Sequence, residues 1–279
     1  MLGEPTLTHR LEGGHDIPLL VWRLSAPARS ISSAVLGGGI GECRWVVNAS
    51  VPMSYDRDDP AAHLGELAAG LGLSGPGVGL LTGVDVADVV AETDEGVRLW
   101  ATVGLGAPVQ AAADEAGQFI NDELASGASG NSSRPGGLHD GELRRGVRGK
   151  SSSSGRPEPD GELRRGERGK SSSSGRPEPG TVNVVVWVPQ RLGDAALVNA
   201  VATITEAKAQ AIRDLGLAAT GTATDAVCVV CPPEGDAAEY GGPRSTWGAR
   251  VARAAYRAVL KGGAVNLAGT QSWSDRMGQ

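Results

Sequence analysis

The sequence predicts an α+β protein in which a mixed β-sheet carries about three helices. Short apolar runs bounded by glycine or proline occur in both halves of the chain, and apolar residues recur at helical spacing in three longer segments. A low-complexity insert at 115–179 separates the halves. We therefore expect one domain formed by 6–114 together with 180–263, followed by a polar tail at 264–279.

The first half is predicted to be rich in strands. Gly13-Gly14 and Gly37-Gly38-Gly39 each lie between two apolar runs, which is typical of β-hairpins. The expected hairpin strands are 6–12 with 17–24, and 29–36 with 44–51. A helix should begin at Pro60, because Asp59 is a good N-cap and proline suits the first helical position. Its buried stripe is Leu64, Leu67 and Leu71, and strands are expected at 78–84, 87–92 and 97–103.

The second half is predicted as strand, helix, strand and helix. The apolar run 181–188 is typical of a central strand, which is buried on both faces. Asp194 should cap a helix that ends at Gly216, since glycine favours the position just past a helix. A strand at 226–231 follows, and a last helix starts at Ser245 or Thr246 and stops before Gly262-Gly263.

The insert contains a tandem repeat, Asp140–Pro159 and Asp160–Pro179, whose copies differ only at Val147 and Glu167. Neither copy has an apolar face, so burial cannot offset the entropy of ordering, and a disordered insert is predicted. Gly146-Val147-Arg148-Gly149-Lys150-Ser151 resembles a phosphate-binding loop, but the spacing of its glycines is too short and no apolar strand precedes it. We therefore reject a nucleotide site there.

The bulk composition favours a cytoplasmic protein. A net charge of −6 argues against general affinity for nucleic acid or anionic membranes. No run approaches the roughly 18 apolar residues that span a bilayer, and the first residues lack the pattern of a signal peptide. Three cysteines, an odd number, fit a reducing compartment better than a disulfide framework. The sequence leaves the oligomeric state open.

Cys228 and Cys231 have the spacing of a metal-binding knuckle, but a strand would point them to opposite faces. Cys43 is the only other cysteine, and the four histidines show no ligand spacing. We therefore predict buried structural thiols and no protein-bound metal.

Polar residues at the joints of the second half suggest a site. Lys208 lies four residues after Ile204, on the apolar stripe of its helix, so it either extends to solvent or meets a carboxylate. Glu206 points to the opposite side and is more typical of a solvated helix residue. Thr222, Thr224 and Asp225 precede a strand, where they either bind substrate or simply form the turn.

Two further polar residues lie at strand ends in the first half. Asn48 is near the end of one apolar strand, and Asp85 follows another. Both either project into a shared cleft or close turns.

In its order of motifs the sequence resembles the adenosylcobinamide amidohydrolase family of corrinoid salvage. The resemblance covers Thr6–Asp114 and Gly180–Gly263 and departs from the family pattern at Ala107-Pro108, where the family has Asn-Pro. The motifs that carry it are Gly37-Gly38-Gly39, Trp45-Val46-Val47-Asn48-Ala49-Ser50-Val51-Pro52, Asp59-Pro60-Ala61-Ala62-His63-Leu64, Gly77-Val78-Gly79-Leu80-Leu81-Thr82-Gly83-Val84-Asp85-Val86, Ala101-Thr102-Val103-Gly104-Leu105-Gly106, Gly180-Thr181-Val182-Asn183, Thr205-Glu206-Ala207-Lys208 and Gly221-Thr222-Ala223-Thr224-Asp225-Ala226.

The resemblance implies hydrolysis of the aminopropanol amide of adenosylcobinamide, which gives adenosylcobyric acid for cobalamin synthesis. The only expected partner is then a corrinoid small molecule whose cobalt arrives with it, and no separate cofactor is needed. Under this hypothesis Glu206 or Asp225 is the general base, oriented by Thr224. Lys208 and Asn183 polarise the carbonyl or hold the oxyanion. The expected substrate-binding residues are Asn48, Asp85, Asn183 and Thr222.

Two alternatives remain open at this stage. One is a corrinoid-binding protein without hydrolase activity, which the departure at Ala107 favours. The other is an interaction protein whose basic insert recruits a partner.

Overall fold

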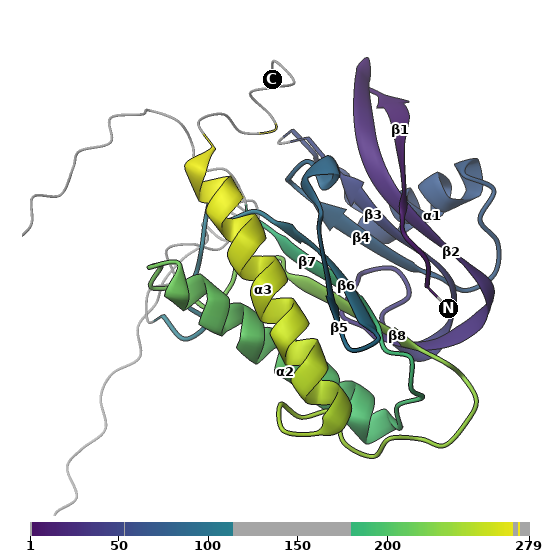
Figure 1. Ribbon diagram of the computed structural model, residues 1–279. Coiled ribbons are helices and arrows are strands. Elements are labelled where there is room, and N and C mark those ends of the chain that lie inside the picture. Colours follow the sequence, from purple (N-terminus) through teal and green to yellow (C-terminus); the bar gives the residue numbers. More distant parts are fainter. Residues whose placement is uncertain (1, 53, 114–179, 270–272, 274–279) are drawn as a thin grey trace, which may run out of the picture. The chain divides into compact units, whose positions relative to one another are not determined.

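The computed structural model describes residues 2–52, 54–113, 180–269 and 273 (Figure 1). They form an eight-stranded mixed sheet with three α-helices, so the predicted α+β fold is confirmed. The predicted insert at 115–179 and nearly all of the tail beyond Gly269 lie outside the described residues. The elements are β1 (Thr6–Glu12), β2 (His15–Ser32), β3 (Gly39–Ser50), α1 (Pro60–Gly70), β4 (Val78–Thr82), the 3-10 helix η1 (Val86–Asp88), β5 (Val90–Asp94), β6 (Val97–Val103), β7 (Val182–Trp187), α2 (Asp194–Asp214), β8 (Ala226–Cys231) and α3 (Thr246–Ala268).

Strands from both halves of the chain interleave in the sheet. Its order is β4-β3-β2-β8-β7-β6-β5, and β1 pairs with β2 outside this path. β7 and β8 are parallel to each other, whereas β7 is antiparallel to β6 and β8 is antiparallel to β2. The first residues of β7 and of β8 therefore lie at the same end of the sheet, and residues of the candidate site lie there.

β2 is one long strand rather than the two strands predicted from 17–24 and 29–36. Its first part pairs with β1 and its last residues pair with β8, while the register with β3 shifts between Arg23 and Ala28. Pro27 falls inside this shift. An irregular stretch tolerates a residue that has no N–H to donate, so the strand continues through the proline.

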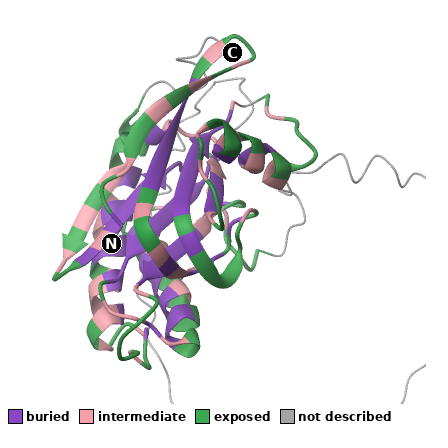
Figure 2. Cartoon of the chain, turned by 90° about the vertical axis from the view of Figure 1, so that its right-hand side faces the viewer, coloured by how far each residue is buried: buried purple, intermediate pink, exposed green. Residues whose placement is uncertain are grey.

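The helices cover different parts of the sheet. α2 and α3 lie side by side on one face of the sheet (Figure 1), with α3 against β5, β6 and β7 and α2 against β8 and β2. Aliphatic residues from both helices and from β6, β7 and β8 form the largest core. A second core on the other face contains three tryptophans, of which Trp22 and Trp100 meet edge to face at 5.8 Å between ring centroids. α1 covers β3 and β4 through Leu64, whereas Leu67 and Leu71 are only partly buried. The strands at the centre are the most completely buried elements (Figure 2).

Two predicted helix boundaries are wrong. Gly193, not Asp194, is the N-cap of α2, and the Asp194 carboxylate instead pairs with Arg29. α3 does not stop before Gly262-Gly263 but continues to Ala268. A Cβ on Gly262 would lie 2.8 Å from Val103 Cγ2, and one on Gly263 would lie 2.4 Å from Leu215 Cδ1. These glycines allow close packing inside the helix rather than ending it.

The largest remaining differences are the starts of two strands. β3 begins at Gly39 rather than at residue 44. The predicted strand 87–92 begins late, because η1 occupies its first residues and β5 starts at Val90. The caps at Asp59 and Ser245 are confirmed, since each side chain accepts a hydrogen bond from the first turn of its helix. Among the described helices, none has the length and apolar character needed to cross a membrane.

Candidate functional site

A cavity of about 510 Å³ lies where the ends of β3 and β4 meet the starts of β7 and β8. Within the described residues its wall is mainly apolar, with serine and threonine hydroxyls, one tyrosine and one carboxylate, that of Asp225. The lining residues come from segments far apart in the sequence: Ser33, Ala34, Val35, Val51, Pro52, Tyr55, Pro60, Gly79, Leu80, Leu81, Thr82, Gly83, Thr181, Thr224, Asp225 and Ala226. Concave, largely apolar sites with a few convergent polar groups are typical of small-molecule binding.

Asp225 organises the polar side of this cavity. Its Oδ1 accepts hydrogen bonds from the Val182 N–H, at 2.8 Å, and from the Thr222 hydroxyl. Its Oδ2 accepts from the Thr222 N–H, at 3.0 Å, and from the Lys208 ammonium. A carboxylate has about four lone-pair positions, so these four bonds fill it. Asp225 therefore ties the start of β7 and the loop before β8 to α2.

Lys208 meets a carboxylate, one of the two alternatives that its place on the apolar stripe left open. Its side chain and that of Asp225 are both 11% exposed in their ion pair. Gly221 leaves room for the pair, because a Cβ there would lie 2.4 Å from Asp225 Oδ2 and 2.5 Å from Lys208 Nζ. The Gly-Thr loop before β8 is thus fitted closely around the ion pair.

Asn48 and Asn183 form a buried bridge beside the cavity. The Asn183 amide donates to Asn48 Oδ1, at 2.9 Å, and to the Leu81 carbonyl, at 2.8 Å. Asn48 in turn donates to the Thr102 hydroxyl at 3.1 Å. The two residues are only 2% and 1% exposed, and Asn183 Oδ1 is buried with no hydrogen-bond partner within the described residues. The bridge joins β3 and β4 to β6 and β7, so it fixes the wall rather than forming it.

Thr181 and Thr224 supply two of the hydroxyl groups of the wall. Their Oγ1 atoms are 2.7 Å apart, and either can be the donor. Both residues line the cavity next to Asp225.

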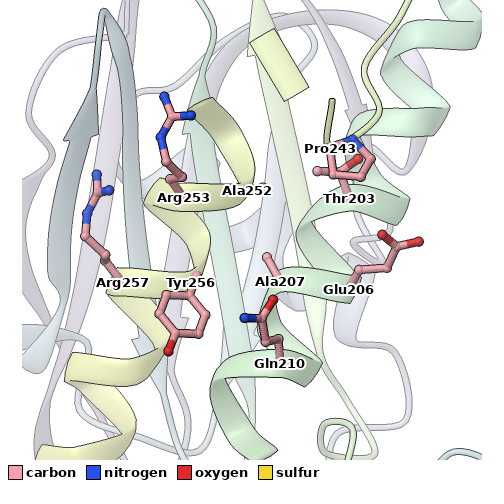
Figure 3. Close-up of a pocket in the computed structure, with 9 residues that line it drawn as sticks. All are labelled: Thr203, Glu206, Ala207, Gln210, Pro243, Ala252, Arg253, Tyr256 and Arg257. Carbon is pink, nitrogen blue, oxygen red and sulfur yellow. The ribbon is translucent and has the colours of Figure 1, made fainter. Parts of the chain in front are cut away.

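Two of the predicted site residues lie elsewhere. Glu206 is exposed on α2 and lines a separate pocket of about 280 Å³ between α2 and α3. Figure 3 shows it on the opposite side of that pocket from Arg253 and Arg257. Asp85 caps η1 by accepting from the Ala87 N–H at 2.9 Å, and it is not among the residues that line the 510 Å³ cavity.

Sequence reasoning missed a second polar cluster at the cavity, centred on His63. Tyr55 lines the cavity, and its hydroxyl lies 3.1 Å from His63 Nδ1. His63 Nε2 lies 3.5 Å from Oε1 of Glu12, whose other oxygen accepts from Arg10 at 2.7 Å. One sequence pattern indicates that His63 is buried: it lies four residues before Leu67 and therefore on the inward face of α1.

The charges around His63 follow from its burial. Desolvation lowers the pKa of His63 against the opposing pull of Glu12, and desolvation also raises the pKa of the Tyr55 hydroxyl. Burial by itself would raise the pKa of Glu12, but the hydrogen bond and charge of Arg10, with His63 and Arg57, lower it. At neutral pH the cluster therefore holds a neutral imidazole, a protonated phenol and a carboxylate.

The three thiols are buried and free, as the sequence predicted for Cys228 and Cys231. Burial raises the pKa of Cys43 to about 11 and raises that of Cys228 as well. Both are protonated at neutral pH, so neither is an activated nucleophile.

The sequence is similar to a known protein family and to two curated proteins. The family model for adenosylcobinamide amidohydrolase matches residues 4–271. A protein of Halobacterium salinarum named adenosylcobinamide amidohydrolase is 43% identical over 83 residues, which are 29% of this chain and 35% of the relative. An uncharacterized protein of Methanocaldococcus jannaschii is 37% identical over 90 residues, again 29% of this chain and 35% of the relative. The chain thus spans about a third of each of these curated relatives.

Proposed function

Because this chain belongs to the adenosylcobinamide amidohydrolase family, we propose that it hydrolyses the amide between a corrin side chain and aminopropanol. The substrate would be adenosylcobinamide and the products adenosylcobyric acid and aminopropanol, within corrinoid salvage. Cobalt would enter as part of the substrate.

The observation that carries this proposal is the 510 Å³ cavity, most of whose lining residues belong to the sequence motifs of the family resemblance. Thr82 comes from the first half, and Thr181, Thr224 and Asp225 come from the second half. The volume is within the range of small-molecule sites but suits an amide-bearing arm better than a whole corrinoid. The arm would enter the cavity while the corrin ring rested at its mouth.

The hydrogen bonds of Asp225 support a different division of roles from the one that the sequence suggested. Asp225 has no free lone pair to take a proton, so we propose that it positions the wall instead of acting as general base. Lys208 balances its charge. The Thr224 and Thr181 hydroxyls would contact the substrate amide and help to stabilise the oxyanion of the tetrahedral intermediate.

The test is incubation of the purified protein with adenosylcobinamide, followed by chromatography and mass analysis for both products. We expect product from the wild type and from Glu206→Ala, because Glu206 lies in a different pocket. Thr224→Val keeps the shape of the side chain and removes its hydroxyl, and we expect it to lower kcat by about 100- to 1,000-fold. Loss of activity in Glu206→Ala with full activity in Thr224→Val would contradict this assignment.

A corrinoid-binding protein without hydrolysis is the second candidate, favoured by the alanine at position 107. Val109 pairs with Gly221, so Ala107 lies close in sequence to a contact with the loop that holds Asp225. With alanine in place of the family's asparagine, this position has no side-chain amide with which to contact a substrate. Intact adenosylcobinamide that co-elutes with the protein without product would favour this candidate, and Ala107→Asn would then be the first variant to assay.

A further inference from the structure

We propose that Tyr55, His63 and Glu12 form a proton relay at the cavity, with Tyr55 as a catalytic residue that meets the attacking water. His63 and Glu12 act through Tyr55 as positioning residues. The inference rests on the proposed amide hydrolysis. It supplies the general base for that reaction, which neither the filled carboxylate of Asp225 nor the distant Glu206 provides.

The geometry forms a chain from the cavity into the protein. Tyr55 is placed by a turn in which its N–H donates to the Pro52 carbonyl at 3.0 Å, and it lines the cavity. Its hydroxyl lies 3.1 Å from His63 Nδ1, and the two rings are stacked at 5.5 Å between centroids. His63 is 1% exposed, so its ring reaches the cavity only through Tyr55.

The far end of the chain is a carboxylate held by two arginines. Glu12 Oε1 lies 3.5 Å from both His63 Nε2 and Arg57, and Oε2 accepts from Arg10 at 2.7 Å. His63 Nε2 is buried without a hydrogen-bond partner within the described residues. An unmet buried donor is costly, and catalytic hydrogen bonds are often long until substrate is bound. The His63–Glu12 contact is therefore poised to shorten when charge develops on the ring.

The charge of Glu12 sets the direction of proton transfer. An ionised carboxylate beside Nε2 favours the tautomer that carries its proton there, which leaves Nδ1 as an acceptor. The Tyr55 hydroxyl then donates to Nδ1 and turns an oxygen lone pair toward the cavity. Burial keeps the pKa of His63 below its ordinary value and that of Tyr55 above, so the resting relay has this arrangement at neutral pH.

The chemical step balances with water as the only co-reactant. Water in the cavity gives a proton to Tyr55 Oη while Tyr55 gives its own proton to His63 Nδ1, and the hydroxide oxygen bonds to the amide carbon. The carbonyl becomes an oxyanion, and the imidazolium is stabilised by Glu12. When the oxyanion collapses, the C–N bond breaks, the amine nitrogen takes a proton from Tyr55, and His63 returns one to Tyr55. The sum is amide plus water to acid plus amine.

The primary test is Tyr55→Phe, which keeps the stacked ring and removes only the hydroxyl. Loss of a general acid–base group lowers rates by about 100- to 10,000-fold, so we expect a fall in kcat of that size with little change in KM. Tyr240→Phe is the matched control, because that tyrosine is 71% exposed and lies outside the cavity lining. Thermal unfolding and binding of adenosylcobinamide by both variants establish that each is folded.

Glu12→Gln tests the positioning roles through a pH profile. The groups that act on His63 are Glu12, Arg57, Arg10 and Glu66, and among them Glu12 is the strongest that raises its pKa. Without that charge the pKa of His63 falls further, so the acid limb of the kcat profile should move to lower pH. A purely structural role for Glu12 would leave the limb in place.

The outcomes separate this inference from the function on which it rests. Wild-type turnover together with unchanged kcat in Tyr55→Phe would overturn the relay and leave the hydrolase proposal standing. Loss of adenosylcobinamide binding in a folded Tyr55→Phe would also overturn it, since the hydroxyl would then serve binding. A wild type that yields no product overturns both.

Discussion

At the scale of single residues, the ion pair of Lys208 and Asp225 combines two roles that are usually separate. The two side chains, each 11% exposed, neutralise each other's charge. The Asp225 carboxylate also accepts hydrogen bonds from the backbone N–H groups of Val182 and Thr222. Breaking a buried pair leaves one charge without compensation, which costs more than the pair contributes. The stability of this edge of the sheet therefore depends on both partners being present.

A double-mutant cycle tests that dependence. We expect Lys208→Met to destabilise the fold by about 3 kcal/mol, because it leaves the Asp225 carboxylate buried and uncompensated. Lys208→Met combined with Asp225→Asn should be less destabilised than the sum of the two single variants, as measured by urea unfolding. Simple additivity would mean that the pair makes no net interaction.

The sequence predicted part of this site for a clear physical reason. Helical periodicity placed Lys208 inward and Glu206 outward, and both placements agree with the structure. The identity of the carboxylate partner was beyond periodicity, since Asp225 reaches Lys208 across a loop and a change of element. Glu12 and His63 were missed because their contact joins β1 to α1, and no local pattern specifies which strand a helix will meet.

At the scale of elements, two kinds of helical glycine predict opposite effects of the same substitution. Gly65 lies inside α1 with open space where a Cβ would be, whereas a Cβ on Gly262 in α3 would meet the branched side chain of Val103 at 2.8 Å. Alanine is better than glycine in a helix by about 1 kcal/mol, but overpacking a core costs about 1–3 kcal/mol. We expect Gly65→Ala to raise the melting temperature and Gly262→Ala to lower it. If both substitutions raised the melting temperature, the Val103 side chain of β6 would have moved to accommodate the new Cβ on α3.

The contact between β5 and α3 predicts a pH-dependent stability. Asp94 accepts from Arg253 at 3.0 Å and from Arg257 at 3.1 Å, and the Arg253 bond with both charges lowers its pKa against the opposing effect of burial. A lowered folded-state pKa stabilises the protein fully above the ordinary value of 3.8, and the stabilisation is lost as pH falls through the folded value. Asp94→Asn should lower the melting temperature at pH 7 by about 2–4 °C, a modest effect because Arg253 is half exposed.

Melting curves over a pH series check this expectation. The difference between Asp94→Asn and the wild type should shrink as pH falls below 3.8. Asp16→Asn is the control, because Asp16 is an exposed residue of the first hairpin. An equal effect at Asp16, or a difference that does not depend on pH, would contradict the role given to the β5–α3 ion pairs.

At the scale of the whole molecule, the order of the strands explains what the sequence could and could not predict. Local signals identified the caps at Asp59 and Ser245, the turn at Gly13-Gly14 and the apolar strands. The insertion of β8 and β7 between β2 and β6 depends on pairing between distant segments, which no window of sequence contains. The cavity depends on that order, because it brings the start of β8 next to the ends of β3 and β4.

The same topology predicts that the tandem repeat can be removed without loss of the proposed activity. Both sides of the insert are attached to the fold: Val109 pairs with Gly221 before it, and the Gly104 N–H donates to Thr181 O after it at 2.9 Å. The described residues that line the cavity come from 33–83 and from 181–226, on either side of the insert. The cost of closing a loop grows slowly with its length, so deletion of 140–179 should change the stability by less than about 1 kcal/mol. Turnover of adenosylcobinamide and urea unfolding of the deletion variant measure both expectations. If the deletion variant folds and binds adenosylcobinamide but no longer hydrolyses it, the repeat takes part in catalysis. If turnover is intact but the variant no longer binds a partner protein, the repeat serves to recruit that partner.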